Sequence, residues 1–163
     1  MGFQTVVNTY PAVGVPGQQV VPGQAVYTAE NYVSDGTVKA GEFAFEKTVT
    51  GNGAAFKTAS ATGTGAPVGF VERNVVASIT DPLKESTAVY NQGIGLAIAL
   101  RGQFYAVATG AVTEGQAVLC DPATGAITYG ASGAANDTGW IVKLPAGVSG
   151  AEGDTVIYER IGA

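Results

Sequence analysis

The apolar residues of this chain stand in short runs between closely spaced turn signals, and this spacing limits the folds that the chain can adopt. Runs such as 68–71, 75–79 and 94–100 are of strand length, and many of the 24 glycines and seven prolines stand between such runs. Short strands at intervals of roughly 8–12 residues, without a helical period, are typical of antiparallel sandwiches and barrels. The sequence therefore predicts an all-β fold, an antiparallel jelly-roll-like sandwich or barrel with an extended N-terminal arm.

The arm is predicted from the first 34 residues. Val-Pro-Gly-Gln occurs twice, at 15–18 and 21–24, and each Pro-Gly pair suits the two central positions of a type II turn. A segment of this kind has little capacity to fold on itself. We expect an extended arm at residues 1–34 and a β-sandwich body at residues 35–163.

The expected strands follow the apolar or alternating runs. They lie at residues 43–45, 68–71, 75–79, 94–100, 103–109, 116–120, 126–129, 140–143 and 155–161, with a strand-like segment at 24–28 in the arm. In the run 94–100, large side chains alternate with Gly95, Ala97 and Ala99. That alternation predicts a face of small residues that a second sheet or backbone can approach closely.

Three turns are expected between these strands. The sequence 121–125 is the clearest hairpin loop, because Asp121, Pro122 and Gly125 suit its first, second and left-handed positions. Residues 51–53 also read as a turn, and one helical turn is expected after Asp81-Pro82.

The charge of the chain argues against two classes of partner. Eight Lys and Arg stand against 13 Asp and Glu, the net charge is −5, and no two basic residues are adjacent. Nucleic-acid binding needs basic patches that neutralise phosphates, so we expect neither a nucleic-acid nor a membrane partner. Charged residues make up only 13% of the chain, whereas about 25% is usual. This composition indicates that much of the surface meets another protein.

No pattern for catalysis, metal binding or cofactor binding stands out. The chain has no histidine, which removes the commonest general base and metal ligand. Its one cysteine, Cys120, reads as a small buried hydrophobe on a strand rather than a reactive thiol. The glycine-rich stretches 51–53 and 63–65 lack the remaining features of phosphate loops, and Glu152 and Asp154 lack calcium-loop spacing. We expect no enzyme, no metal and no cofactor.

The opening sequence resembles the start of a known family. Met1-Gly-Phe-Gln-Thr-Val-Val-Asn8, followed by Pro11-Ala12, is similar to the Gly-Phe-Gln-Thr-Thr-Val-Asn-like opening of the structural cement (capsid decoration) proteins of tailed bacteriophages. Val6 stands where a second Thr is common. Further similarity lies at 38–45, 101–107, 115–118, 121–127 and 138–140, and it is weakest between residues 51 and 92.

The resemblance implies a structural protein on the outer surface of the virion capsid. Such a protein binds the expanded shell and bridges neighbouring major capsid subunits, and its partners are the major capsid protein and itself, as a dimer or trimer. We expect it to be synthesised in the host cytoplasm, since no secretion signal or membrane-length apolar run is present. The implied interface residues lie in the first part of the arm: Phe3, Gln4, Thr5, Val6, Val7, Asn8, Tyr10 and Pro11.

Two alternatives stay open at this point. The arm can wrap the protein's own body instead of gripping a neighbour. The protein can also be an adhesion or carbohydrate-binding β-module, as on a tail fibre, in which Trp140 and the seven tyrosines stack on sugars.

Overall fold

The computed structural model describes residues 14–47, 56–74 and 88–162 of the chain. These residues form eleven strands and no helix, which confirms the predicted all-β class. The strands are β1 (Val26–Tyr27), β2 (Tyr32–Ser34), β3 (Phe43–Lys47), β4 (Lys57–Ser60), β5 (Gly69–Val71), β6 (Gly95–Leu96), β7 (Ile98–Val107), β8 (Ala117–Cys120), β9 (Ile127–Gly130), β10 (Asp137–Lys143) and β11 (Thr155–Arg160).

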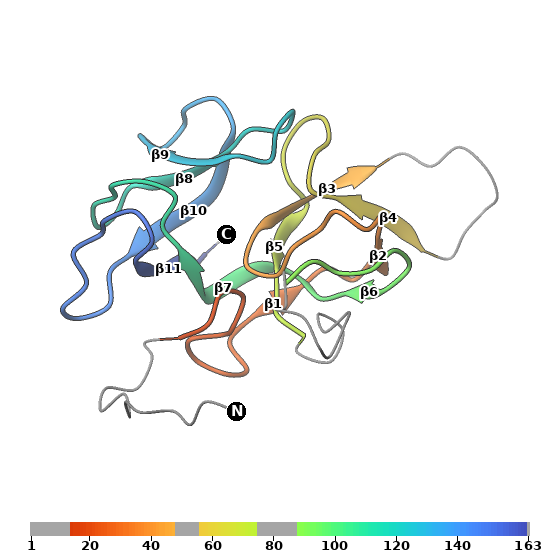
Figure 1. The fold of residues 1–163 in the computed structure, drawn as a ribbon, viewed down its shortest axis with the longest axis horizontal. Helices are drawn as coiled ribbons and strands as arrows, with labels where there is room; N and C mark the ends of the chain where they lie inside the picture. The colour runs from red at the N-terminus through yellow and green to blue at the C-terminus, as the bar shows by residue number, and fades with distance from the viewer. Residues whose placement is uncertain (1–13, 48–55, 75–87, 163) are drawn as a thin grey trace, which may run out of the picture.

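One hydrogen-bonded network joins all eleven strands. Their order is β6-β2-β4-β3-β5-β7-β11-β10-β8-β9, and β1 pairs with β7 beside this path. Every pairing is antiparallel except that of β2 with β4. The C-terminal strands β8–β11 lie on one side of the molecule and β2, β4 and β6 on the other, with β7 between them (Figure 1). The strand β7 is therefore shared by both halves, while the predicted jelly-roll connectivity stays a prediction.

Aromatic side chains from both halves meet in the main core. Phe43 of β3 and Phe70 of β5 pack against each other, with ring centroids 5.4 Å apart, and against Trp140 of β10 and Tyr158 of β11, with ring centroids 5.5–6.2 Å apart. Phe104 of β7 completes the cluster, 5.3 Å from Phe70 and 6.0 Å from Trp140. All five rings are buried. Offset and edge-to-face pairs of this kind add to the stabilisation that apolar burial provides.

A second, smaller core lies under the strands β2–β6. It contains Tyr32, Val38, Ala44, Val71 and Ile98 among its buried members. Tyr90 is also buried there, and its hydroxyl donates to the carbonyl of Glu72 at 2.7 Å. The N-terminal half thus has a core of its own beside the shared aromatic cluster.

The C-terminal half curls so that β9 returns to the end of β7. The hydroxyl of Thr109 donates to the carbonyl of Ile127 at 2.7 Å, and the Thr109 amide donates to the Tyr129 hydroxyl at 3.1 Å. The hydroxyls of Tyr129 and Tyr158 lie 2.8 Å apart inside the curl. These polar contacts fix the outermost strand to the chain that follows β7.

Most expected strands coincide with observed ones, although β2 and β4 were not expected. The strands expected separately at 94–100 and 103–109 are corrected, because β7 runs without a break through residues 101–102. The run 94–100 contains two strands, β6 and the start of β7, interrupted at Ala97. It divides because β6 pairs with β2 whereas β7 begins against β5 and β1. Gly95 and Ala97 are exposed, and a Cβ at Gly95 meets nothing within 4 Å, so the expected close approach to a small face is wrong there.

The hairpin at residues 121–125 forms as predicted, between β8 and β9. Asp121 Oδ1 accepts from the Ala123 amide at 3.0 Å, and Oδ2 accepts from the Thr124 hydroxyl at 2.9 Å. Gly125 has a φ of 72°, and its amide donates to the Asp121 carbonyl at 2.7 Å. The expected strand at 75–79, the turn at 51–53 and the helical turn after Asp81-Pro82 lie outside the described residues.

Replacement of Phe70 tests the aromatic core. Phe70 is 0% exposed, whereas Phe56, the first residue before β4, is 56% exposed. We expect Phe70→Ala to lower the free energy of unfolding by about 3–5 kcal/mol, and Phe56→Ala to change it by less than about 0.5 kcal/mol. Chemical denaturation measures both values. Equal effects of the two substitutions would contradict the assignment of this core.

Candidate functional site

The interface residues predicted from the sequence lie in a part of the chain that the structure does not describe. Phe3, Gln4, Thr5, Val6, Val7, Asn8, Tyr10 and Pro11 all precede residue 14, the first described residue. The structure instead shows the segment that connects them to the body. We call residues 14–23 the N-terminal strap.

The strap pairs with the middle of β7. The Gly17 amide donates to the Tyr105 carbonyl at 2.8 Å, and the Tyr105 amide donates to the Gln18 carbonyl at 2.9 Å. The Val20 amide donates to the Gln103 carbonyl at 2.9 Å. After a turn at Pro22-Gly23, β1 continues along the same strand, where Val26 pairs with Arg101. The strap is thus hydrogen-bonded to the central strand of the sheet.

The sequence predicted residues 1–34 as an arm separate from the body, and the described part of that segment is arranged differently. Residues 14–34 contain the strap, β1 and β2, and β2 pairs with β4 and β6. These pairings could not be predicted from the sequence, because every partner strand lies further along the chain. Described residues 14–34 therefore pair with other strands of the chain, while the division into an arm at 1–34 and a body at 35–163 stays a prediction.

The first Pro-Gly turn of the strap packs between the backbone at Arg73 and the backbone at Gly41. The Gln18 amide donates to the Val15 carbonyl at 2.9 Å, and Gly17 has a φ of 82°, as the predicted type II turn requires. The Gly17 carbonyl accepts from the Arg73 amide at 2.8 Å. A Cβ at Gly17 would lie 2.9 Å from the amide nitrogens of both Arg73 and Gly41. Only glycine fits at this crossing of three backbones.

Gln19 fixes the second turn of the strap through its side chain. Its Nε2 donates to Glu72 Oε1 at 2.8 Å and also to the Tyr27 hydroxyl, while its Oε1 accepts from the Gly23 amide at 3.1 Å. Burial, and then the neighbouring Glu72 carboxylate, raise the pKa of Tyr27 above its ordinary value. The pairing of Gln19 with Glu72 could not be predicted from local sequence, since the two residues stand 53 positions apart.

Exposed apolar side chains line the surface around the strap. A groove of about 440 Å³ lies between the strap and Glu72-Arg73, lined by Val15, Gln18, Gln19 and Pro22 on the strap side. Six large hydrophobic side chains are exposed in the described part of the chain. Four of them lie in the strap, in β1 or directly after β11: Val15, Val21, Val26 and Ile161. Exposed apolar residues that gather in one region are typical of protein–protein contact.

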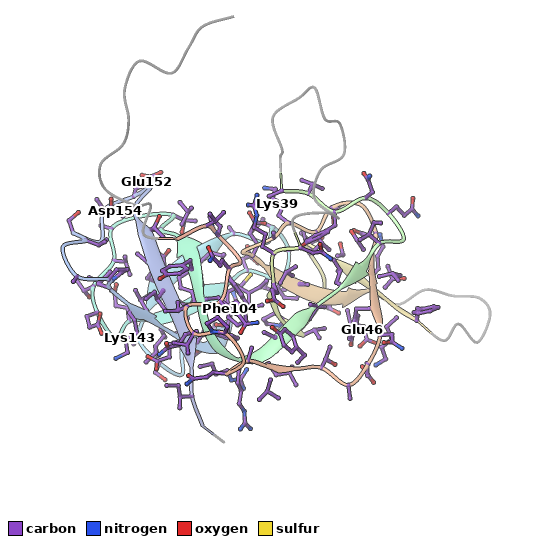
Figure 2. The ribbon with its side chains drawn as sticks, turned by 90° about the horizontal axis from the view of Figure 1, so that it is seen from below. Lys39, Glu46, Phe104, Lys143, Glu152 and Asp154 are labelled. Carbon is purple, nitrogen blue, oxygen red and sulfur yellow. The ribbon has the colours of Figure 1, made fainter. Side chains whose placement is uncertain are left out.

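Cys120 and Asp154, which the sequence offered as a candidate reactive thiol and a candidate calcium ligand, have structural roles. Cys120 is 1% exposed, and burial raises its pKa to about 12, so the thiol stays protonated at neutral pH. Asp154 accepts from the Ser149 hydroxyl at 2.8 Å and the Ala151 amide at 3.0 Å, closing a turn. Glu152 and Asp154 lie at the rim of the molecule (Figure 2).

The described residues offer neither a metal-binding cluster nor a membrane-spanning helix. Within residues 14–47, 56–74 and 88–162, no group of three or more His, Cys, Asp or Glu side chains is placed to hold a metal ion. The same residues include no helix with the length and apolar character needed to cross a membrane.

The aromatic residues named for sugar binding are mostly inside the protein. Trp140 is 0% exposed, and Tyr32, Tyr90 and Tyr158 are also buried. Tyr27, Tyr105 and Tyr129 are half-buried. A Cβ at Gly14 would lie 2.3 Å from the Tyr105 ring, so the strap covers part of that ring. The indole on which the carbohydrate-binding alternative depended is not available to stack on a sugar.

The two Pro-Gly turns of the strap provide a matched test of its attachment. Gly17 and Gly23 share a φ of 82°, but a Cβ at Gly23 meets nothing within 4 Å. Ala in a left-handed conformation costs about 1–2 kcal/mol, and the overlap at Gly17 adds a further ~1–3 kcal/mol. We therefore expect Gly17→Ala to destabilise the protein more than Gly23→Ala.

Hydrogen exchange checks where this effect acts. Gly17→Ala should speed exchange of the Tyr105 and Arg73 amides, which donate to strap carbonyls, whereas Gly23→Ala should not. Equal exchange in the two variants would show that the strap is not held at this crossing.

Comparison with known proteins identifies the family. The family model described as "Structural cement protein (E217 gp24/Pam3 gp6)" matches residues 3–160. A search of curated proteins found no match. The matched range begins within the predicted interface segment and extends through β11. The chain therefore belongs to the phage structural cement protein family, and it is a structural protein of the virion capsid.

Proposed function

We propose that this protein binds the outer surface of an expanded tailed-phage capsid and bridges neighbouring major capsid subunits. The observation that carries the proposal is the family match over residues 3–160, which includes the segment from Phe3 to Pro11. We assign the contact with the shell to Phe3, Gln4, Thr5, Val6, Val7, Asn8, Tyr10 and Pro11. The protein acts as a homo-oligomer, a dimer or trimer, and is synthesised in the host cytoplasm.

The strap supports this role because it connects the contact segment to a rigid base. Three hydrogen bonds join the strap to β7, and a fourth joins Gly17 to Arg73. Load applied to the segment before residue 14 passes into β7, which is central in the sheet. An arm that holds shell subunits together needs such a base, because a loosely attached arm would detach from its own body before the shell subunits separated.

The composition of the contact segment favours apolar burial over ion pairing. Phe3, Val6, Val7 and Tyr10 are apolar or aromatic, and residues 1–29 contain no Asp, Glu, Lys or Arg. Burial of a Val or Phe side chain contributes roughly 1.5–3 kcal/mol, whereas an exposed ion pair contributes about 0–1 kcal/mol. A few buried side chains therefore suffice for attachment.

Bridging stabilises the shell by mass action. A protein that binds only the assembled arrangement of subunits adds its binding free energy to the cost of separating them. Multiple arms on one oligomer strengthen this effect, because the second contact forms at a high effective concentration. Attachment and shell stabilisation are then two readouts of the same contact.

Removal of residues 2–12 tests the proposal. The truncated protein keeps the strap, so we expect its melting temperature and circular dichroism to stay close to those of the full chain. We expect its attachment to expanded, undecorated shells of the encoding phage to be lost. Occupancy is measured by co-sedimentation and mass analysis of the shells.

Point substitutions refine the same assay. Phe3→Ala and Tyr10→Ala should reduce occupancy. Lys57→Ala should leave it unchanged, because Lys57 pairs with Glu30 and Glu46 of its own chain, at 2.7 and 3.1 Å. Full occupancy by a folded, truncated protein would overturn the assignment of residues 3–11 as the contact segment.

A further inference from the structure

A small hollow lies where β1, the middle of β7 and the end of β11 meet. It has a volume of about 170 Å³ and is lined by Gln24, Val26, Arg101, Gly102, Gln103, Arg160, Ile161 and Gly162. The register explains this grouping, because Val26 pairs with Arg101 across β1 and β7, and Gly102 pairs with Arg160 across β7 and β11. Two arginines and two aliphatic residues, from β1, β7 and the end of β11 with the residue that follows it, thus line one hollow.

The aliphatic members of the hollow are unusually exposed. Ile161 is 76% exposed and Val26 is 52% exposed. Ile161 is the most exposed of the large hydrophobic residues that the structure describes. The hollow also borders the strap, since the carbonyl of Gln103 accepts from the Val20 amide. A partner that contacts the strap therefore meets this hollow as well.

The arginines around the hollow differ in their ion pairing from the lysines that the structure describes. Each lysine of the described residues has a carboxylate of its own chain within 4 Å: Lys39 with Glu42, Lys47 with Asp35, Lys57 with Glu30 and Lys143 with Glu114. Within the same described residues, Arg101 and Arg160 form no ion pair. Acidic residues outnumber basic ones by 13 to 8 in the whole chain, so this pairing pattern does not reflect a shortage of carboxylates.

Arg160 is also held in place. Its Nη1 donates to the Thr138 carbonyl at 3.3 Å, and a Cβ at Gly139 would lie 3.3 Å from its Cζ. The guanidinium therefore rests along the backbone of β10. An oriented guanidinium loses less conformational entropy when it binds a carboxylate, and its planar fork suits bidentate contact.

We propose that this hollow receives an acidic side chain of the major capsid protein together with an adjacent apolar residue. The carboxylate binds Arg101 and Arg160, and the apolar residue packs on Val26 and Ile161. The inference rests on the proposed function, and it adds a second contact to that of residues 3–11. Charge complementarity favours an acidic protein segment over nucleic acid, because two arginines on a chain of net charge −5 do not form a basic patch.

The double variant Arg101→Gln/Arg160→Gln tests the proposal, with Lys39→Gln/Lys47→Gln as the matched control of equal charge change. Binding of the full chain to expanded, undecorated shells is titrated at about 0.15 M salt. We expect the arginine variant to bind about tenfold more weakly, and the lysine variant to stay within about twofold of the wild type. Ile161→Ser, at an exposed position, should also weaken binding without changing the melting temperature.

The outcomes separate the two proposals. Absence of wild-type binding to the shells would contradict the proposed function itself. Wild-type binding that neither the arginine variant nor Ile161→Ser weakens would overturn the hollow as a contact and leave the arm assignment intact. If the double variant is unstable, the single variant Arg101→Gln, at an exposed position, decides the question. Retention of a DNA fragment by the wild type, lost in the arginine variant, would also overturn the acidic-protein assignment.

Discussion

Pairing on both edges of β7 is the interaction on which the rest of this structure depends. One edge pairs with β5 and β11, and the strap and β1 follow the other. The two halves of the protein are joined through this strand, and its Phe104 packs against Phe70 and Trp140 of the aromatic cluster. Gly102 permits this arrangement: its φ is 135°, and a Cβ there would lie 3.0 Å from the Phe104 ring and 3.1 Å from Ala25. A side chain at this point would push the strap side of the molecule away from the core.

The same pairing gives the proposed capsid contact its mechanical basis. The predicted contact residues precede residue 14, and the chain that follows them is fixed at once to the central strand by hydrogen bonds and by the crossing at Gly17 and Gly41. The lining of the hollow at Arg101 and Arg160 includes Gln103, whose carbonyl accepts from the Val20 amide of the strap. The proposed contact segment, its base and part of the proposed second contact are therefore all connected to β7. This arrangement suits the proposed function, in which the protein resists separation of shell subunits.

Features specified by neighbouring residues were predictable from the sequence, and features specified by distant pairing were not. The hairpin at Asp121–Gly125 and the turn at Gly17 follow from local turn chemistry, so they were predicted correctly. The attachment of residues 14–34 to the body was missed, because β7 begins more than 60 residues after the strap ends. That Arg101 and Arg160 line one hollow could likewise not be predicted, since it depends on the register of β7 on β11. The resemblance in residues 1–12 indicated the family that the match over residues 3–160 shows, and the contact role of those residues stays a prediction.

A cryo-electron microscopy reconstruction of shells decorated with this protein tests bridging most directly. The account predicts density that leaves the body at the strap, beside β7, and continues onto a shell subunit other than the one beneath the body. The hollow at Arg101 and Arg160 should face an acidic side chain of the shell. A reconstruction in which each copy contacts a single shell subunit, with residues 3–11 folded back on their own body, would contradict the account.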